Sequence, residues 1–287
     1  MTNKIAAIQM TSGMDLDANL MLAKKLLTYA AKQGALLAVL PEMFPLMGKG
    51  EEFKVAKTAI QEQLGQGKIQ DFLANEAKRL NMWIVGGTLP LASDDPNKNY
   101  AACLVWNAKG EVVAHYNKMH LFDVTLSETE FYKESESTMA GDRIIFLDTP
   151  VGRVGLSVCY DVRFPELYRA MFLRGAQVFV IPSAFTVPTG RAHWEILLRA
   201  RAIENFCYVV AAAQWGEHGQ GRKTFGHSMI VAPTGKVMTS LPEGLGVVMA
   251  EIDLTFLQKE REKIPVAQHQ RIFCDVSAFK IGGHYAD

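Results

Sequence analysis

Short runs of apolar, often β-branched residues alternate with amphipathic helical patterns along almost the whole chain. The segment KIAAIQM at residues 4–10 predicts a strand, and a helix capped by Asp17 is expected to follow it and to end at Gly34. The apolar run ALLAVL at residues 35–40 then predicts a second strand. Strands that alternate with helices in this way are typical of proteins in which helices cover the faces of a sheet. We therefore predict an α/β fold.

The alternation continues along the chain without a linker rich in Pro, Gly or Ser. The later elements are predicted in this order: a helix at 69–80, a strand at 83–89, a hairpin of 100–107 and 111–117, a strand at 152–158, a helix at 165–174, a strand at 177–183, a helix at 193–206, strands at 207–213, 226–233, 236–240 and 247–253, and a helix at 254–263. Residues 121–142 have weak periodicity and predict a long surface loop. We expect one domain, residues 1–287, whose two halves pack sheet on sheet with helices outside.

The composition argues against several classes of function. Thirty Lys and Arg residues balance thirty Asp and Glu residues at a pI of about 7.1, so no global charge favours nucleic acid or an acidic membrane surface. No window approaches the roughly 18 uninterrupted apolar residues that predict a membrane span, and we expect no secretion signal. The four cysteines are far apart and form no CxxC pair, which predicts free thiols in a reducing cytoplasm.

Three polar residues follow predicted strands: Glu42, Lys118 and Cys159. Ligand sites of α/β sheets lie at the ends of strands, so these side chains are expected to converge. A carboxylate base, an ammonium that stabilises an oxyanion and a thiol nucleophile are the groups needed to cleave an amide through a thioester. Taken singly, each has an ordinary structural reading as a strand-end charge or a core cysteine. Cys159 lies at a predicted strand-to-helix corner, which is expected to favour its thiolate.

The sequence around these residues resembles a known family. LPEMF around Glu42, YNKMHLFDV around Lys118 and GLSVCYDVRFPELYR around Cys159 are similar, in order and spacing, to the three signature segments of the carbon–nitrogen hydrolase (nitrilase) superfamily. The resemblance extends to AHWEILLRARAIENFCYVVAAAQ and GHSMIVAPTG, so it covers nearly the whole chain. It implies a four-layer α-β-β-α sandwich, a Glu-Lys-Cys triad, no cofactor, and assembly into homodimers or larger homo-oligomers.

The resemblance also implies a role for each matching residue. Cys159 is the expected nucleophile, and Glu42 is the expected base that takes its proton. Lys118 and the backbone N–H of Tyr160 are expected to form the oxyanion hole. Glu134 matches an additional glutamate that positions the substrate and Lys118. Three other glutamates lie in the same segment and leave that assignment open: Glu128, Glu130 and Glu136.

Several segments are most similar to the deaminated glutathione amidase branch, namely ESESTMAGD, SAFTVPTGRAHWE, RKTFGHSMIV and IPVAQHQR. This similarity implies a small 2-oxo-acid amide as substrate. Arg163 is the arginine nearest to Cys159 in sequence and is a candidate for binding its carboxylate, and Phe185 and Thr186 are candidates for the pocket wall. Arg191 and Arg222 are further candidates. Arg163 has the alternative of a structural ion pair with Glu166 or Glu195, and Phe185 that of plain packing.

Other functions stay open at this stage. Omega-amidases share AHWE and GHS with this chain, and N-carbamoyl or aliphatic amides would use the same chemistry on another substrate. A catalytically silent binding protein on the same fold is the non-enzyme alternative. His193 and Glu195 form an H-x-E pair, but the P-C-x-x-C segment of a zinc deaminase is absent, so we expect no metal. A papain-like pair of Cys159 with His193 or His227 has no local signature.

Overall fold

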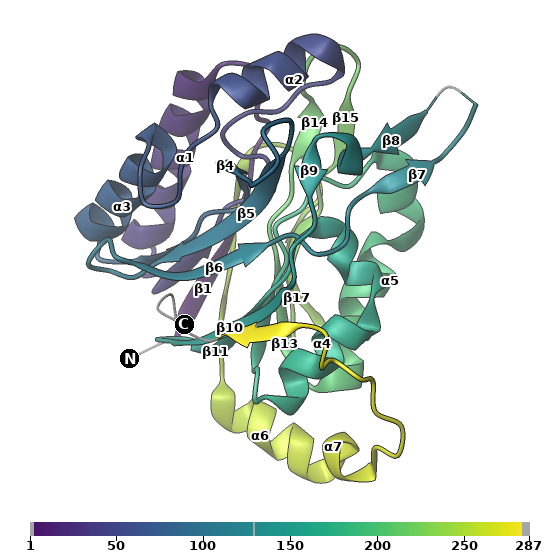
Figure 1. Cartoon of the computed structure of the whole chain (residues 1–287). Coiled ribbons are helices and arrows are strands. Elements are labelled where there is room, and N and C mark those ends of the chain that lie inside the picture. Colours follow the sequence, from purple (N-terminus) through teal and green to yellow (C-terminus); the bar gives the residue numbers. More distant parts are fainter. Residues whose placement is uncertain (1–2, 129, 283–287) are drawn as a thin grey trace.

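Two β-sheets pack face to face in the computed structural model of the chain, and helices cover both outer faces (Figure 1). The structure describes residues 3–128 and 130–282. The predicted domain of residues 1–287 also includes residues 1–2, 129 and 283–287, which lie outside the described part of the chain. The layers are α-β-β-α, which confirms the predicted sandwich.

The first sheet contains most of the N-terminal half of the chain. Its order is β18-β1-β2-β3-β5-β4, with β6 and β9 both paired to β5. Strands β1, β2 and β3 are parallel to one another, as expected for strands joined by helices. The strands are β1 (Lys4–Gln9), β2 (Leu37–Val39), β3 (Trp83–Val85), β4 (Leu89–Ala92), β5 (Asn99–Trp106), β6 (Val112–Asn117), β9 (Thr138–Met139) and β18 (Gly246–Glu251).

The second sheet contains most of the C-terminal half. Its order is β17-β16-β13-β12-β11-β10-β19, and β11, β12 and β13 form its parallel centre. The strands are β10 (Arg143–Thr149), β11 (Gly152–Leu156), β12 (Val178–Val180), β13 (Tyr208–Ala211), β16 (Ser228–Val231), β17 (Val237–Leu241) and β19 (Lys280–Gly282).

The outer layers are two pairs of helices. Helices α1 (Leu16–Lys32) and α3 (Lys68–Leu80) cover the first sheet, and α4 (Pro165–Leu173) and α5 (Val187–Asn205) cover the second (Figure 1). Helix α2 (Gly50–Ala59) lies beyond them, and α6 (Leu254–Lys263) and α7 (Val266–His269) follow the last strand of the first sheet. The predicted cap of α1 was wrong by two residues, because the side chain of Asp15 accepts from Ala18 N and Asp17 lies in the first turn.

The side chains of β1 show how one strand serves two cores. Ile5 and Ala7 face the core between the sheets, whereas Ala6 and Ile8 face α1 and α3, and all four are fully buried. Successive side chains of a strand point to opposite faces, so a strand covered on both faces is apolar throughout. This explains why the strands appear in the sequence as continuous apolar runs.

The segment 121–142 differs from the predicted loop. It contains the hairpin of β7 (Asp123–Thr125) and β8 (Phe131–Lys133), a 3-10 turn η1 (Glu134–Glu136) and β9. Figure 1 shows this hairpin projecting beside a second two-stranded ribbon, β14 (Trp215–Glu217) and β15 (Lys223–Phe225). None of the helices in the described part of the chain combines the length and apolar character that crossing a membrane requires.

Candidate active site

Glu42 lies in the turn that follows β2. The next residue, Met43, has a φ of +56°, and its N–H donates to Thr88 Oγ1 at 2.8 Å. Gln214 Nε2 donates to the carbonyl oxygen of Glu42 at 3.1 Å and ties this turn to the second sheet. The Glu42 side chain is buried, so these bonds fix a carboxylate inside the protein.

Lys118 follows β6 and is almost completely buried. Its backbone N–H donates to Ala101 O at 3.0 Å. Its Nζ lies 2.8 Å from Glu42 Oε1 and 2.8 Å from Glu134 Oε2. Burial alone would lower the pKa of Lys118, but the negative charges of Glu134 and Glu42 raise it well above its ordinary value. The ammonium is therefore held permanently charged between two carboxylates.

Glu134 lies in η1, within the segment that was predicted as a loop. Its Oε2 also accepts from the backbone N–H of Phe122 at 2.8 Å. Burial would raise the pKa of Glu134, but the charge and hydrogen bond of Lys118 lower it. Glu136, two residues later, instead lies 3.8 Å from Lys54 Nζ. The geometry therefore brings Glu134 to Lys118 and directs Glu136 away from it.

Cys159 is buried at the start of a 3-10 turn, η2 (Cys159–Arg163), just after β11. Its φ is +49°, a left-handed conformation that residues with a Cβ seldom adopt outside functional sites. Its N–H donates to Pro182 O at 2.9 Å, which fixes this conformation. Burial and then the negative charge of Glu42 raise the pKa of the thiol well above its ordinary value, although Lys118 opposes the shift. The expectation of a thiolate at this corner was therefore wrong, and the resting thiol is neutral.

A buried carboxylate that the sequence analysis missed joins these segments. Asp161 is fully buried, and its Oδ1 accepts from the backbone N–H of His120 at 3.0 Å and lies 2.7 Å from His120 Nδ1. Its Oδ2 accepts from Tyr116 OH at 2.7 Å and from Val158 N at 2.8 Å. Tyr116 and His120 flank Lys118, and Val158 precedes Cys159. Asp161 therefore fastens the Lys118 strand to the Cys159 turn.

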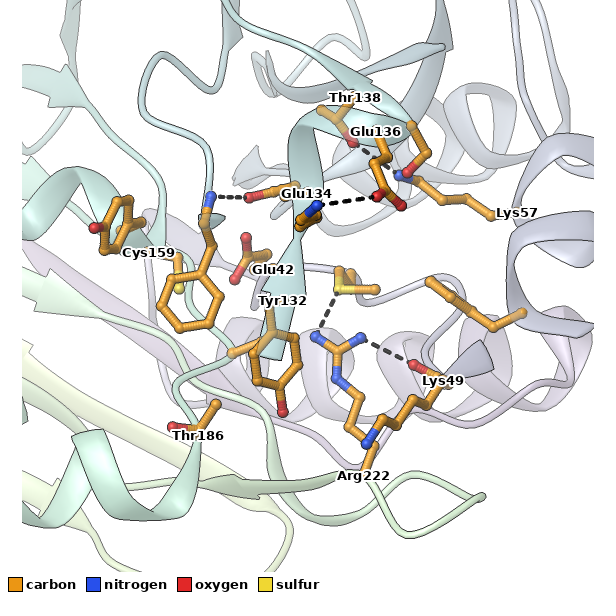
Figure 2. A pocket seen from close by; sticks show the side chains of 18 of the residues that line it. Glu42, Lys49, Lys57, Tyr132, Glu134, Glu136, Thr138, Cys159, Thr186 and Arg222 are labelled. Atoms are coloured by element: carbon orange, nitrogen blue, oxygen red, sulfur yellow. Dashed lines mark hydrogen bonds and ion pairs between the residues drawn. The ribbon is translucent and has the colours of Figure 1, made fainter. Parts of the chain in front are cut away.

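The side chains of Glu42, Lys118, Glu134 and Cys159 all line one cavity of about 340 Å³. That volume is within the range for small-molecule sites, roughly 300–1,000 Å³. Figure 2 shows Cys159 and Glu42 near each other, and Lys57, Lys49 and Arg222 beyond Glu42. The remaining lining residues come from α2, the segment around the β7–β8 hairpin, β9, η2, and α5 with the residues just before it, and include Phe53, Phe122, Tyr132, Thr138, Tyr160, Ala184, Phe185, Thr186 and Thr189.

Three of the four predicted substrate-binding residues line the cavity, and the fourth does not. Tyr160, Phe185 and Thr186 line the cavity. Arg163 does not line it: its guanidinium lies 5.8 Å from the ring centre of Tyr160 and 5.5 Å from that of Phe185, and its Nη2 is 3.2 Å from His193 Nδ1. Neither of the predicted alternatives, Glu166 and Glu195, lies within ion-pair distance of Arg163. Arg163 therefore packs against two side chains of the cavity wall.

The two histidines considered as partners of Cys159 make other contacts. His193 contacts Arg163, and the ring of His227 stacks on Phe225 at 4.0 Å between centroids. Neither is among the groups whose charge or hydrogen bond acts on Cys159, whereas Glu42 is. In residues 3–128 and 130–282, no group of three His, Cys, Asp or Glu side chains is arranged to hold a metal ion.

Lys57 is a charged cavity residue that the sequence analysis missed. It comes from α2, a helix without fully buried residues, and its Nζ donates to Thr138 Oγ1 at 3.2 Å. Nothing in the local pattern distinguishes it from an ordinary surface lysine. A signal for Asp161 did exist, since it lies two residues after Cys159 in an otherwise apolar stretch.

Comparison with known proteins identifies the family. Residues 4–262 match the model of the carbon–nitrogen hydrolase family. The deaminated glutathione amidase of Synechocystis is 41% identical over 93% of this chain and 97% of its own length, and the human protein of that name is 43% identical over 93% of this chain and 82% of its own length. The crystal structure of Saccharomyces cerevisiae Nit3, a member of branch 10 of the nitrilase superfamily, matches with a TM-score of 0.84 at 30% identity, over 94% of this chain and 97% of Nit3. The chain therefore belongs to the carbon–nitrogen hydrolase family and is an amidase with a Glu-Lys-Cys triad.

Proposed function

We propose that this protein hydrolyses deaminated glutathione, the amide of 2-oxoglutarate with cysteinylglycine, to 2-oxoglutarate and Cys-Gly. This reaction would return a damaged metabolite to two usable compounds. The observation that supports it best is the buried Lys118, held at 2.8 Å by both Glu42 and Glu134 in the cavity that also contains Cys159. The relatives named deaminated glutathione amidase support the choice of substrate.

The first half of the reaction forms a thioester. Because the resting Cys159 is a neutral thiol, Glu42 takes the Sγ proton as Sγ attacks the amide carbonyl carbon. Negative charge then develops on the carbonyl oxygen, where the Lys118 ammonium and the Tyr160 N–H stabilise it. The C–N bond breaks as Glu42 gives its proton to the leaving nitrogen, and Cys-Gly departs.

The second half reverses these proton transfers. Glu42 takes a proton from a water molecule, whose oxygen attacks the thioester carbonyl carbon. The C–S bond breaks, the sulfur regains the proton from Glu42, and the new carboxylic acid loses the second water proton to solvent and leaves as 2-oxoglutarate. Lys118 stays protonated throughout, because two carboxylates raise its pKa. Glu134 holds Lys118 in place, and Phe185 and Thr186 form the wall against the acyl group.

The test is release of 2-oxoglutarate from deaminated glutathione, measured in parallel with release from 2-oxoglutaramate, using Cys159→Ala as the blank. We expect the wild type to prefer deaminated glutathione and Cys159→Ala to be inactive with an unchanged circular dichroism spectrum. Preference for 2-oxoglutaramate would make the protein an omega-amidase. Turnover by Cys159→Ala would refute the nucleophile, and silence of the wild type on both would direct the search to N-carbamoyl and aliphatic amides, or to a silent binding protein.

We also propose that copies of the chain form a homodimer or larger homo-oligomer in the cytoplasm. The segment after α6 exposes large apolar side chains, among them Ile272, which is 85% exposed, and Phe273. Such side chains are commonly covered by a partner. The four cysteines are free thiols, which suits a reducing compartment. Light scattering after size-exclusion chromatography would contradict the oligomer if it gave a mass near 31.8 kDa.

A further inference from the structure

The cavity is positively charged although the chain as a whole is neutral. Its lining contains three carboxylates and six cationic side chains, whereas the full sequence has equal numbers of acidic and basic residues. The six cations are Lys49, Lys54, Lys57, Lys118, Lys133 and Arg222. An excess of cations that is confined to one cavity favours an anionic ligand there.

Most of these cations have an evident reason to be present. Lys118 lies between Glu42 and Glu134. Lys54 lies 3.8 Å from Glu136, and Lys133 lies 4.0 Å from the same carboxylate. Lys49 is exposed and therefore hydrated. The surroundings of these four cations therefore explain their presence without a bound ligand.

Lys57 and Arg222 differ from the other four. Both are partly buried, and neither lies within ion-pair distance of a carboxylate in the described part of the chain. Lys57 donates to Thr138 Oγ1, and Arg222 donates to Gly48 O at 2.9 Å and contacts Met43 Sδ at 3.6 Å. A partly desolvated cation that has only neutral partners gains more from an incoming anion than a hydrated one does.

The position of these two residues indicates which part of a substrate they face. In the proposed reaction Glu42 protonates the leaving nitrogen, so the leaving group must extend on the Glu42 side of Cys159. Arg222 contacts Met43, the residue that follows Glu42. Figure 2 shows Lys57 and Arg222 beyond Glu42 as seen from Cys159, while Thr186 lies on another wall. The two cations therefore lie on the side of the leaving group.

We propose that Lys57 and Arg222 form a subsite that binds a carboxylate on the leaving amine. This inference rests on the proposed function and makes it more specific, because the leaving group of deaminated glutathione ends in the carboxylate of glycine. The subsite gives the enzyme a preference for amides whose leaving amine carries an anionic terminus. Ammonia, the leaving group of 2-oxoglutaramate, makes no use of it.

The electrostatics of Lys57 agree with this assignment. The pKa of Lys57 is lowered to about 8, mainly by burial; the charges of Lys118 and Arg222 act in the same direction, and those of Glu134 and Glu42 oppose them. Both cations line the same cavity, and the charge of Arg222 acts on Lys57. A bound carboxylate would relieve their repulsion. Because the subsite needs the ammonium form, its contribution to binding is present below pH 8 and is lost as the pH rises above that value.

The experiment compares two substrates that differ only in the charge of the leaving group. The first is deaminated glutathione, and the second is the same compound with the glycine carboxylate replaced by a carboxamide. We expect Lys57→Met and Arg222→Met each to reduce the ratio of kcat/KM for acid over amide by roughly 10- to 100-fold, the value of one charge-assisted hydrogen bond. The loss should lie in KM. Both substrates are measured on one preparation, so partial unfolding cancels in the ratio.

Two further variants serve as controls. Lys57→Arg keeps the positive charge, so it should retain most of the preference for the acid and remove its decline above pH 8. Lys54→Met removes a lysine one turn earlier on α2 whose charge Glu136 already balances, so its ratio should stay within about twofold of the wild type.

The proposal is overturned if the ratio stays unchanged in Lys57→Met and Arg222→Met, or if both substrates and 2-oxoglutaramate lose activity equally. The latter result would place the cations on the acyl carboxylate or in a structural role. Failure of the proposed function is a separate result, since it is read from the wild type alone: an enzyme that ignores deaminated glutathione fails there before any variant is made.

Discussion

Asp161 offers the sharpest test of how the active site is held together. Each of its oxygens accepts one backbone N–H and faces one side-chain partner: Oδ1 pairs with the N–H and Nδ1 of His120, and Oδ2 with Val158 N and Tyr116 OH. Replacing Asp161 by Asn keeps the shape but turns one oxygen into an NH₂ group. The side-chain partner can adapt, because a tyrosine hydroxyl or the other imidazole tautomer accepts a hydrogen bond. The backbone N–H can only donate, so it cannot adapt to the new NH₂ group.

Either orientation of the new amide therefore leaves one backbone donor without an acceptor in a dry interior. An unsatisfied buried donor costs about 1–3 kcal/mol, and the remaining bonds lose the strength of a charged acceptor. We expect Asp161→Asn to reduce the free energy of unfolding by about 2–4 kcal/mol. Because Asp161 ties the Lys118 segment to the Cys159 turn, we also expect kcat to fall by roughly 10- to 100-fold, the effect of misplacing catalytic groups by an ångström or less.

The assay combines urea unfolding with steady-state kinetics at a temperature where the variant is fully folded. The loss should lie in kcat while KM stays near the wild-type value, since a purely structural change would lower only the folded fraction. Asp148→Asn is the control: its side chain is 69% exposed and pairs with Arg153 at the surface, so its stability should change by less than about 0.5 kcal/mol. A stability loss below about 1 kcal/mol in Asp161→Asn, or full kcat in the folded variant, would refute the reasoning.

Two other predictions concern acid stability and the turn that carries Glu42. Burial lowers the pKa of His218 to about 4, below the 6.5 of an unfolded histidine, so folding stability is complete above pH 6.5 and is lost as the pH falls towards 4. The stability lost in this way is about 3 kcal/mol. Urea unfolding at pH 6.5 and at pH 4 should therefore show that acidification costs His218→Gln about 3 kcal/mol less than it costs the wild type. Equal losses in the two proteins would contradict this prediction. Gly87 has a φ of +57°, and a Cβ there would lie 2.1 Å from Pro41 O. Gly87→Ala should therefore reduce the free energy of unfolding by about 2–4 kcal/mol and lower kcat. Gly34 is the control: it has a φ of +84° and its Cβ would meet no atom within 4 Å, so Gly34→Ala should cost about 1 kcal/mol. Similar shifts of the melting temperature in the two variants would argue against the clash.

The parts of the fold that follow from local pattern were predictable. Helix α6 begins and ends at the predicted residues, and the hairpin of β5 and β6 pairs as expected. Helix α2 was missed because none of its residues is fully buried, so its sequence has no apolar stripe to detect. Strands β7 and β8 have three residues each and expose two of them, which is too short for alternation to be visible. The pairing of β10 with β19 joins segments more than 130 residues apart and has no local signal.

The same distinction applies to the site. Glu42, Lys118 and Cys159 could be found because each follows a strand within a recognisable segment, and the structure brings their segments to one cavity. Arg163 was chosen for its nearness in sequence, but its guanidinium packs against the rings of Tyr160 and Phe185 and does not line the cavity. Lys57 was invisible because its role depends on burial against a segment 81 residues away. Proximity along the chain is a poor guide where the backbone turns sharply.

The charges of the cavity separate catalysis from binding. The charge of Lys118 is already compensated by Glu42 and Glu134, so it cannot also attract a distant carboxylate. The thiol of Cys159 is neutral at rest, so no thiolate repels an incoming anion. Of the cations that line the cavity, Lys57 and Arg222 are the partly buried ones without a carboxylate partner in the described part of the chain, and in our proposal they lie on the side where the amine departs. An anionic amide can therefore be oriented by one pair of cations, while the Lys118 ammonium stays paired with Glu42 and Glu134.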